Sequence, residues 1–264
     1  MHPMATVYND LLIERHADGV VEVVINRPQR LNALSTQVKN ELVHFFRGAN
    51  AAADVAAIVL TGGGERAFAA GQDLSEAKDY TPDLIAGWID SFHHLYSAVL
   101  ECEKPTVAAV NGYAVGAGFQ LLMLCDIRLA ADHARFGMPE VDDAIPCITG
   151  TWTLYNTIGH ARTADLVLTG RMIDAEQALS WGLVKEVVER SALRARAVEL
   201  ATDLARKPAV AVRLNKARLR WLLERERDSA EEFAKVAHAE AYGTGLPQQK
   251  MADFLARRRE GRST

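Results

Sequence analysis

Two glycine-rich turns, each following a short apolar run, constrain this chain of 264 residues more than any other feature. The first reads Phe68-Ala69-Ala70-Gly71-Gln72-Asp73-Leu74, and the second reads Asn111-Gly112-Tyr113-Ala114-Val115-Gly116-Ala117-Gly118. Short apolar runs are typical of buried strands, and small residues let the main chain approach a ligand or another backbone closely. The pattern predicts a fold in which buried strands alternate with helices.

The two turns are open to two interpretations. Main-chain amides at the start of a helix have no partner within the helix and favour negative charge, so two such turns could hold a carbonyl oxygen as it becomes an oxyanion. Alternatively, both turns are tight strand-to-helix connections that need glycine for geometry alone.

Local patterns predict the elements around these turns. The Asp18-Gly19 pair lies between two apolar runs and predicts a hairpin, and Ser35 is a candidate N-cap. Further strands are expected at Ile58–Leu60, Val107–Val110, Ile127–Ala130 and around Phe136, and helices are expected over 84–100, from Gln120 and from Asp174 to Trp181.

The chain changes character near Ser191, after which it is charged, rich in alanine and helical in pattern. We therefore predict an α/β core over residues 1–190 and a helical C-terminal module over 191–264. The formal net charge of −4 gives no general attraction to nucleic acid or to anionic membranes. Neither a signal-peptide layout nor a membrane-spanning apolar run is present, so a soluble cytoplasmic protein is expected.

Several cofactor and metal motifs do not match. A dinucleotide fingerprint beginning at Gly116 would need glycine where Leu121 stands, and no phosphate-binding P-loop or His-Glu-x-x-His helix occurs. Three cysteines lack metal-ligand spacing and are expected as reduced thiols, and no metal site is predicted.

The ordered set of motifs resembles the enoyl-CoA hydratase/isomerase (crotonase) superfamily over about residues 13–255. The motifs that carry the resemblance are Asn26-Arg27-Pro28 with Leu31–Leu34, then Ala67–Leu74, Pro105–Gly118, Phe136-Gly137-Met138-Pro139-Glu140, Leu168-Thr169-Gly170 and Ala178–Val184. Each motif alone is weakly specific, whereas their order and spacing together are highly specific.

The resemblance implies a crotonase-like α/β spiral of ββα units with a helical C-terminal trimerisation module, assembled as a homotrimer or a dimer of trimers. It implies an acyl-CoA thioester as substrate and no separate cofactor. By similarity, the main-chain N–H groups of Gln72 and Ala117 would form the oxyanion hole. The CoA and substrate contacts would come from Arg30, Leu31, Ala33, Ala70, Gln72, Asp73, Leu74, Ser75, Gly116, Ala117 and Phe254, the last reaching a neighbouring subunit's CoA.

The resemblance also places two catalytic positions. Family members that add water typically use two glutamates, and this chain has Glu140 at one position and Gln120 at the other. A neutral amide can orient water but cannot accept or release a proton at ordinary pH. The leading hypothesis is a hydratase, a lyase in which Glu140 is the acid/base residue. The alternatives are an enoyl-CoA isomerase, a feruloyl-CoA-type hydratase/lyase, and a non-catalytic CoA-binding protein.

The segment after Glu140 departs from many relatives and is expected to shape the acyl pocket together with Trp152 and Tyr155. The adjacent Asp142 and Asp143 could contact a polar substrate or form a solvated turn. The acyl group is therefore the feature that the resemblance transfers least.

Overall fold

The computed structural model describes residues 7–224 and 226–260, with side chains as far as residue 257. Its strands are β1 (Leu11–Arg15), β2 (Val20–Ile25), β3 (Ala57–Gly62), β4 (Ala67–Ala69), β5 (Thr106–Val110), β6 (Tyr113–Val115), β7 (Ile127–Ala131), β8 (Arg135–Gly137), β9 (Met172–Asp174) and β10 (Glu186–Val188). Its α-helices are α1 (Thr36–Ala51), α2 (Leu74–Ala77), α3 (Ile85–Leu100), α4 (Ala117–Met123), α5 (Ile148–Thr169), α6 (Ala175–Ser180), α7 (Leu193–Ala205), α8 (Ala209–Glu224), α9 (Arg227–Gly243) and α10 (Leu246–Glu260).

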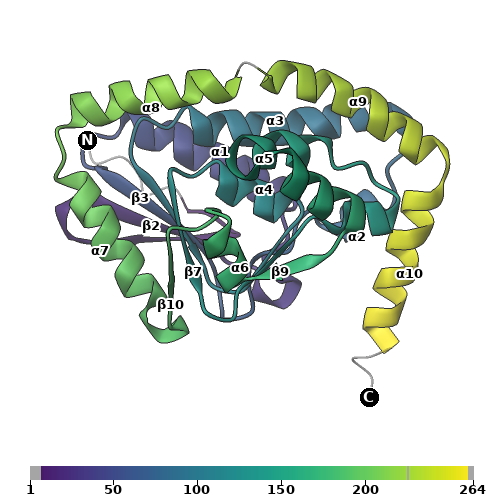
Figure 1. Cartoon of the computed structure of the whole chain (residues 1–264), viewed down its shortest axis with the longest axis horizontal. Coiled ribbons are helices and arrows are strands. Elements are labelled where there is room, and N and C mark those ends of the chain that lie inside the picture. The colour runs from purple at the N-terminus through teal and green to yellow at the C-terminus, as the bar shows by residue number, and fades with distance from the viewer. Residues whose placement is uncertain (1–6, 225, 261–264) are drawn as a thin grey trace.

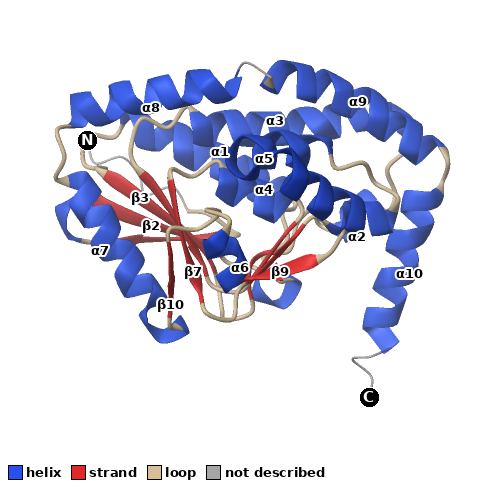
Figure 2. Ribbon diagram, in the orientation of Figure 1, coloured by secondary structure: helices blue, strands red, loops and turns tan. Residues whose placement is uncertain are grey.

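The described strands form two sheets. The larger has the order β1-β2-β3-β5-β7-β10 and is parallel except for β1, while the smaller has the order β4-β6-β8-β9 and is parallel except for β9. The chain forms a strand of the larger sheet, then a strand of the smaller sheet, and then a helix, and it repeats this order with the pairs β3–β4, β5–β6 and β7–β8 (Figure 2). This repetition is the predicted spiral of ββα units.

The local predictions at the N-terminal end are confirmed. Strands β1 and β2 pair in antiparallel register from Leu11 opposite Ile25, and Asp18 and Gly19 both take positive φ in the connection. Ser35 caps α1, because its Oγ accepts a hydrogen bond from the Val38 amide at 3.2 Å.

Helices cover both faces of the larger sheet. The main core lies where α1 and α3 pack over strands from both sheets, and a second cluster lies where α7 packs on β2, β3, β5 and β7. Helices α8 and α9 run along one edge of the molecule, and α10 projects from the end of α9 (Figure 1). Helix α7 follows the predicted boundary at residue 190 yet packs on the larger sheet, and the boundary itself stays a prediction.

One helix start differs from its prediction. Helix α4 begins at Ala117, directly after Gly116, whereas the sequence predicted a start at Gln120. The glycine-rich stretch has weak local helix propensity, and packing against β4 and β6 holds it helical. Over the described residues, every helix is too short or too polar to cross a membrane.

Candidate active site

A cavity of about 590 Å³ lies between the two glycine-rich turns, α3, the 3-10 helix η4 (Pro139–Asp143) and α10. It brings together nearly all of the residues predicted from the sequence. The predicted residues that line it are Arg30, Leu31, Ala33, Ala70, Gln72, Asp73, Leu74, Gly116, Ala117, Gln120, Glu140 and Phe254.

The two glycine-rich turns pack directly against each other at this cavity. A Cβ on Gly71 would lie 3.0 Å from the Val115 carbonyl oxygen and 3.7 Å from the Ala117 nitrogen. A Cβ on Gly118 would lie only 2.1 Å from the Ala69 carbonyl oxygen, so this close approach requires glycine. The glycines therefore serve a geometric need, and that same geometry brings the second turn beside Gly71.

Two main-chain amides at this junction have no partner in the described chain. Leu34 forms an isolated parallel β-bridge with Gln72, in which the Leu34 N–H donates to the Gly71 carbonyl and the Asp73 N–H donates to the Leu34 carbonyl. The Gln72 N–H takes part in neither hydrogen bond. Ala117 is the first residue of α4, and its N–H likewise donates to no described group. These are the two amides that the sequence predicted for an oxyanion hole.

The Glu140 carboxylate lies beside the second turn. A Cβ on Gly116 would stand 3.2 Å from Glu140 Oε1, and positive φ at Gly116 also favours glycine there. Glu140 Oε2 is buried and has no hydrogen-bond partner. Burial raises the pKa of Glu140 to about 7, against the lowering effect of hydrogen bonds that include those from Cys147 and Gln120. Such a carboxyl can take up and release a proton near neutral pH.

Gln120 is held between Glu140 and a buried tyrosine. The Tyr96 hydroxyl donates to Gln120 Oε1 at 2.8 Å, and Gln120 Nε2 donates to Glu140 Oε1 at 3.2 Å. Because the amide oxygen is occupied by Tyr96, the amide presents its N–H groups to the carboxylate. Burial raises the pKa of Tyr96 well above its usual value, so its hydroxyl stays protonated as the donor.

Most of the predicted CoA contacts lie on the first turn and in the segment before α1, and the others lie on the second turn and on α10. Asp73 accepts from Arg27 at 2.9 Å, and Ser75 donates to it at 2.6 Å; burial opposes ionisation of Asp73, but these hydrogen bonds outweigh it and lower the pKa. Ser75 is exposed and does not line the cavity. Phe254 lines the cavity of its own chain, and its contact with a neighbour's CoA stays a prediction.

The segment after Glu140 lines the cavity as expected, through Ile145, Pro146, Ile148 and Thr149, and so do Asp142 and Asp143. Trp152 and Tyr155 are absent from the lining. The Trp152 indole is buried against α8, where it donates to the Leu223 carbonyl at 3.0 Å, and Tyr155 is exposed. Trp152 instead lines a small adjoining pocket that shares Ile89, Phe92 and Thr149 with the cavity. The role of the two aromatic residues in shaping the acyl pocket stays a prediction.

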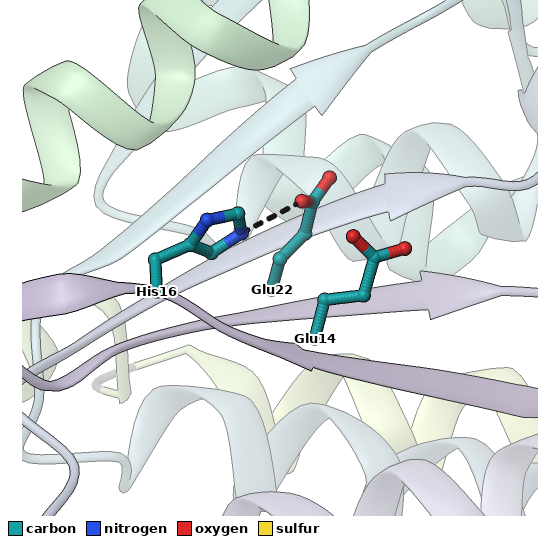
Figure 3. Close-up of side chains that lie close together, drawn as sticks. All are labelled: Glu14, His16 and Glu22. Carbon is teal, nitrogen blue, oxygen red and sulfur yellow. Dashed lines mark hydrogen bonds and ion pairs between the residues drawn. The ribbon is translucent and has the colours of Figure 1, made fainter.

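One group of potential metal ligands occurs among the described residues, formed by Glu14, His16 and Glu22 on the β1–β2 hairpin (Figure 3). His16 Nε2 lies 3.1 Å from Glu22 Oε2. Arg194 of α7 donates to Glu22 Oε1 at 2.7 Å and to Glu14 Oε2 at 3.0 Å. The guanidinium supplies the positive charge that the two carboxylates need, so we assign an ion-pair network between the hairpin and α7.

Two polar residues behind the cavity wall, Tyr96 and Lys39, were not predicted from the sequence. Tyr96 lies in the helix predicted over 84–100, and no local pattern marks it, because its contact with Gln120 spans 24 residues. Lys39 could have been found from the sequence, because it lies one helical turn after the N-cap Ser35 and on the same helix face as the apolar Leu42 and Phe46. A charged residue on an apolar helix face is uncommon unless it has a role.

Known proteins resemble this chain over nearly its whole length. The family model described as enoyl-CoA hydratase/isomerase matches residues 15–259. A short-chain-enoyl-CoA hydratase from Clostridium acetobutylicum is 37% identical over 95% of this chain and 96% of its own. A carboxymethylproline synthase from Pectobacterium carotovorum is 36% identical over 86% of this chain and 93% of its own.

Solved structures give the same answer for the fold. The crystal structure of an enoyl-CoA hydratase/isomerase from Xanthobacter autotrophicus superimposes with a TM-score of 0.86 at 29% identity, covering 97% of this chain and 95% of that one. The match extends across both sheets and the C-terminal helices. The chain belongs to the enoyl-CoA hydratase/isomerase (crotonase) family of acyl-CoA enzymes.

Proposed function

We propose that this enzyme adds water across the double bond of a 2-enoyl-CoA thioester, with Glu140 as its acid/base residue. The observation that carries the proposal is the Glu140 carboxylate, which has one unpartnered buried oxygen and packs against Gly116, the residue before the Ala117 amide. The hydratase from Clostridium acetobutylicum, similar over nearly the whole chain, supports the same reaction.

The mechanism uses the two unpaired amides and one carboxylate. The thioester oxygen accepts from the N–H groups of Gln72 and Ala117, which makes the β-carbon electrophilic. Ionised Glu140 takes a proton from a water molecule while the hydroxide forms a bond to the β-carbon, and the electron pair of the double bond moves into an enolate. Protonated Glu140 then delivers that proton to the α-carbon, and the carboxylate is regenerated.

Gln120 has an orienting role in this scheme. One N–H of its amide donates to Glu140, and the second N–H is available to the oxygen of the attacking water. Tyr96 holds the amide in this orientation from behind. The water would then donate to Glu140 and accept from Gln120, which positions it for attack with a single acid/base residue.

The proposal is tested by replacing the carboxylate with its neutral isostere. Glu140→Gln should lower kcat for a short 2-enoyl-CoA by roughly a thousandfold, because it removes the proton acceptor, while binding of CoA thioesters remains. Glu199→Gln, at an exposed position on α7, is the matched control and should retain full activity. Undiminished turnover by Glu140→Gln would overturn the assignment of Glu140.

A second candidate is an enoyl-CoA isomerase, and the Tyr96–Gln120 contact favours it. With its oxygen engaged by Tyr96, the Gln120 amide takes up no proton. Isomerisation, like the hydration above, needs only Glu140, which would carry one proton between two carbons of the acyl chain. Incubation with a 3-enoyl-CoA distinguishes the two reactions, since isomerisation moves the double bond without changing the mass. Hydration of a 2-enoyl-CoA adds the mass of one water.

We also propose that the chain assembles as a homotrimer or a dimer of trimers. Helices α8 and α9 expose large apolar side chains along one edge of the molecule, among them Leu219, Phe233 and Val236 at 58%, 61% and 66% exposure. Exposed apolar groups that gather on adjacent helices are typical of subunit interfaces. The proposed assembly follows the family pattern and is tested below.

A further inference from the structure

A lysine is buried behind the cavity wall without an acidic partner. Lys39 on α1 is only 1% exposed, and among the described side chains no carboxylate forms an ion pair with its ammonium group. The nearby Glu76 carboxylate accepts from the amide and the hydroxyl of Thr36 instead. Burial lowers the pKa of Lys39 to about 8, with Glu76 opposing the shift, so the side chain still carries its charge at neutral pH.

The groups in direct contact with this ammonium group are neutral, and two of them belong to the cavity wall. Lys39 Nζ donates to Ser91 Oγ at 2.8 Å and to Gln72 Oε1 at 3.3 Å, and it lies 4.1 Å from the centroid of the Phe92 ring. Gln72 and Phe92 both line the cavity. The positive charge therefore stands one side chain away from the space that the acyl group would occupy.

Two donors converge on a single atom of that wall. Gln72 Oε1 accepts from Lys39 Nζ and also from Trp88 Nε1, the latter at 3.2 Å. Gln72 is half-buried, and its main-chain N–H is one of the two amides assigned to the thioester oxygen. The two donors therefore lie within one side chain's length of the amide that would hold the thioester oxygen.

We propose that Lys39 and Trp88 recognise a carboxylate at the far end of the substrate's acyl chain, with Lys39 as the specificity-determining residue. In the free enzyme the Gln72 amide oxygen occupies the place of a carboxylate oxygen. Rotation of the Gln72 side chain would break its hydrogen bonds with Lys39 Nζ and Trp88 Nε1, and both groups could then donate to the substrate carboxylate. The inference rests on the proposed function, because it names the acyl group of that same thioester.

An anion fits this position better than a neutral polar group. A neutral acceptor already satisfies the two donors, whereas only an anion supplies the charge that buried Lys39 lacks. Asp142 and Asp143 of η4 also line the cavity, and their carboxylates would repel an anion. Burial and then Asp142 raise the pKa of Asp143, while Lys250 and Arg257 of α10 lower it. Arg30, Lys250 and Arg257 also line the cavity, but all three are exposed to solvent. Lys39 is buried and pairs with no described carboxylate, so a substrate carboxylate gains most beside the Lys39–Trp88 donor pair.

Binding of saturated thioesters tests this without any need for turnover. Calorimetry with succinyl-, glutaryl- and adipyl-CoA is compared with butyryl-, valeryl- and hexanoyl-CoA, which match them in carbon number and lack the carboxylate. For at least one chain length, we expect the unmodified enzyme to bind the thioester that carries the terminal carboxylate with a Kd roughly tenfold to a hundredfold lower than that of its matched partner. Lys39→Met should abolish or reverse this preference, and Ser91→Ala, which keeps the charge, should retain it.

A second variant tests the inference even if Lys39→Met fails to fold. Gln72→Ala keeps its main-chain N–H and removes the internal acceptor, so the preference for the carboxylate should widen. Equal binding of each matched pair by the unmodified enzyme, or a preference that survives Lys39→Met, would overturn the inference. Hydration of crotonyl-CoA and of a 2-enoyl-CoA that carries a terminal carboxylate is measured separately. Absence of hydration with both substrates would count against the proposed function and leave the binding result unaffected.

Discussion

At the scale of single residues, the chemistry depends on how burial tunes one carboxyl group. Glu140 is a glutamate like many others in the sequence, and its distinguishing property is a pKa near 7 that comes from burial. The sequence located Glu140 and Gln120 through their motifs. It could not supply the pKa, the unpartnered Oε2 or the Tyr96 contact, because these depend on residues that fold together from distant segments.

The raised pKa predicts a pH dependence with a definite sign. The proposed mechanism begins with ionised Glu140, and the ionised fraction grows as the pH rises through the pKa of about 7. We therefore expect kcat/KM to rise with pH between about 6 and 8 and then to level off. The measurement is initial rates of hydration across this range, with protein stability checked at each pH. A profile that is flat or falling across this range would contradict the assignment of Glu140 as the initial base.

Tyr96 provides a second test at this scale. Tyr96→Phe removes the donor to Gln120 Oε1, so the amide is no longer held with its N–H groups toward Glu140. We expect kcat to fall roughly tenfold with KM little changed, as one hydrogen bond is lost. The pKa seen in the pH–rate profile should rise, since Glu140 loses a stabilising donor.

The readout in the pH profile separates positioning from a general loss of structure. Tyr155→Phe is the matched control, because Tyr155 is exposed on α5 and does not line the cavity. If Tyr96→Phe lowers kcat without moving the apparent pKa, Tyr96 does not act through Gln120 and Glu140.

At the scale of elements, the two glycine-rich turns determine the geometry of the site. Their locations were predictable, because glycine and flanking apolar runs are local signals. The choice between a bare connection and an oxyanion hole was not, since it depends on the close packing of turns about 45 residues apart in the sequence. The late predicted start of α4 has the same origin: tertiary packing holds Ala117 and Gly118 in a helix that local propensity disfavours.

The close approach of the turns predicts a large effect of one added methyl group. Gly118→Ala would place a Cβ 2.1 Å from the Ala69 carbonyl oxygen, where backbone must move. We expect a loss of about 3 kcal/mol in the free energy of unfolding, at the upper end for an overpacked site, together with loss of turnover. Gly87→Ala is the control, because no atom lies within 4 Å of a Cβ there and alanine favours helix α3. Chemical denaturation of both variants would measure the difference, and an unaffected Gly118→Ala would contradict the packing.

At the scale of the whole molecule, the exposed apolar edge formed by α8 and α9 predicts self-association. Helices were predictable here from the sequence, whereas a trimer is implied only by the family resemblance, because no local pattern distinguishes a subunit interface from a core-facing side of a helix. Phe233→Glu places a charge within this apolar edge. We expect the unmodified protein to have three or six times the chain mass of 28.9 kDa in light scattering and the variant to dissociate.

The control for this test lies at the other end of the chain. Leu12→Glu changes an exposed apolar residue on β1, away from α8 and α9, and should leave the assembly intact. A Phe233→Glu protein that keeps the mass of the unmodified protein would show that the apolar edge of α9 is not part of the interface.

The proposed reaction is tested most directly by the mass of the product formed from crotonyl-CoA in ¹⁸O-labelled water. For the unmodified enzyme we predict a 3-hydroxyacyl-CoA heavier than the substrate by one labelled water, and for Glu140→Gln we predict recovered substrate. An unmodified enzyme that binds crotonyl-CoA and returns it without the added water, or a Glu140→Gln variant that forms the labelled product at the same rate, would contradict hydration by Glu140.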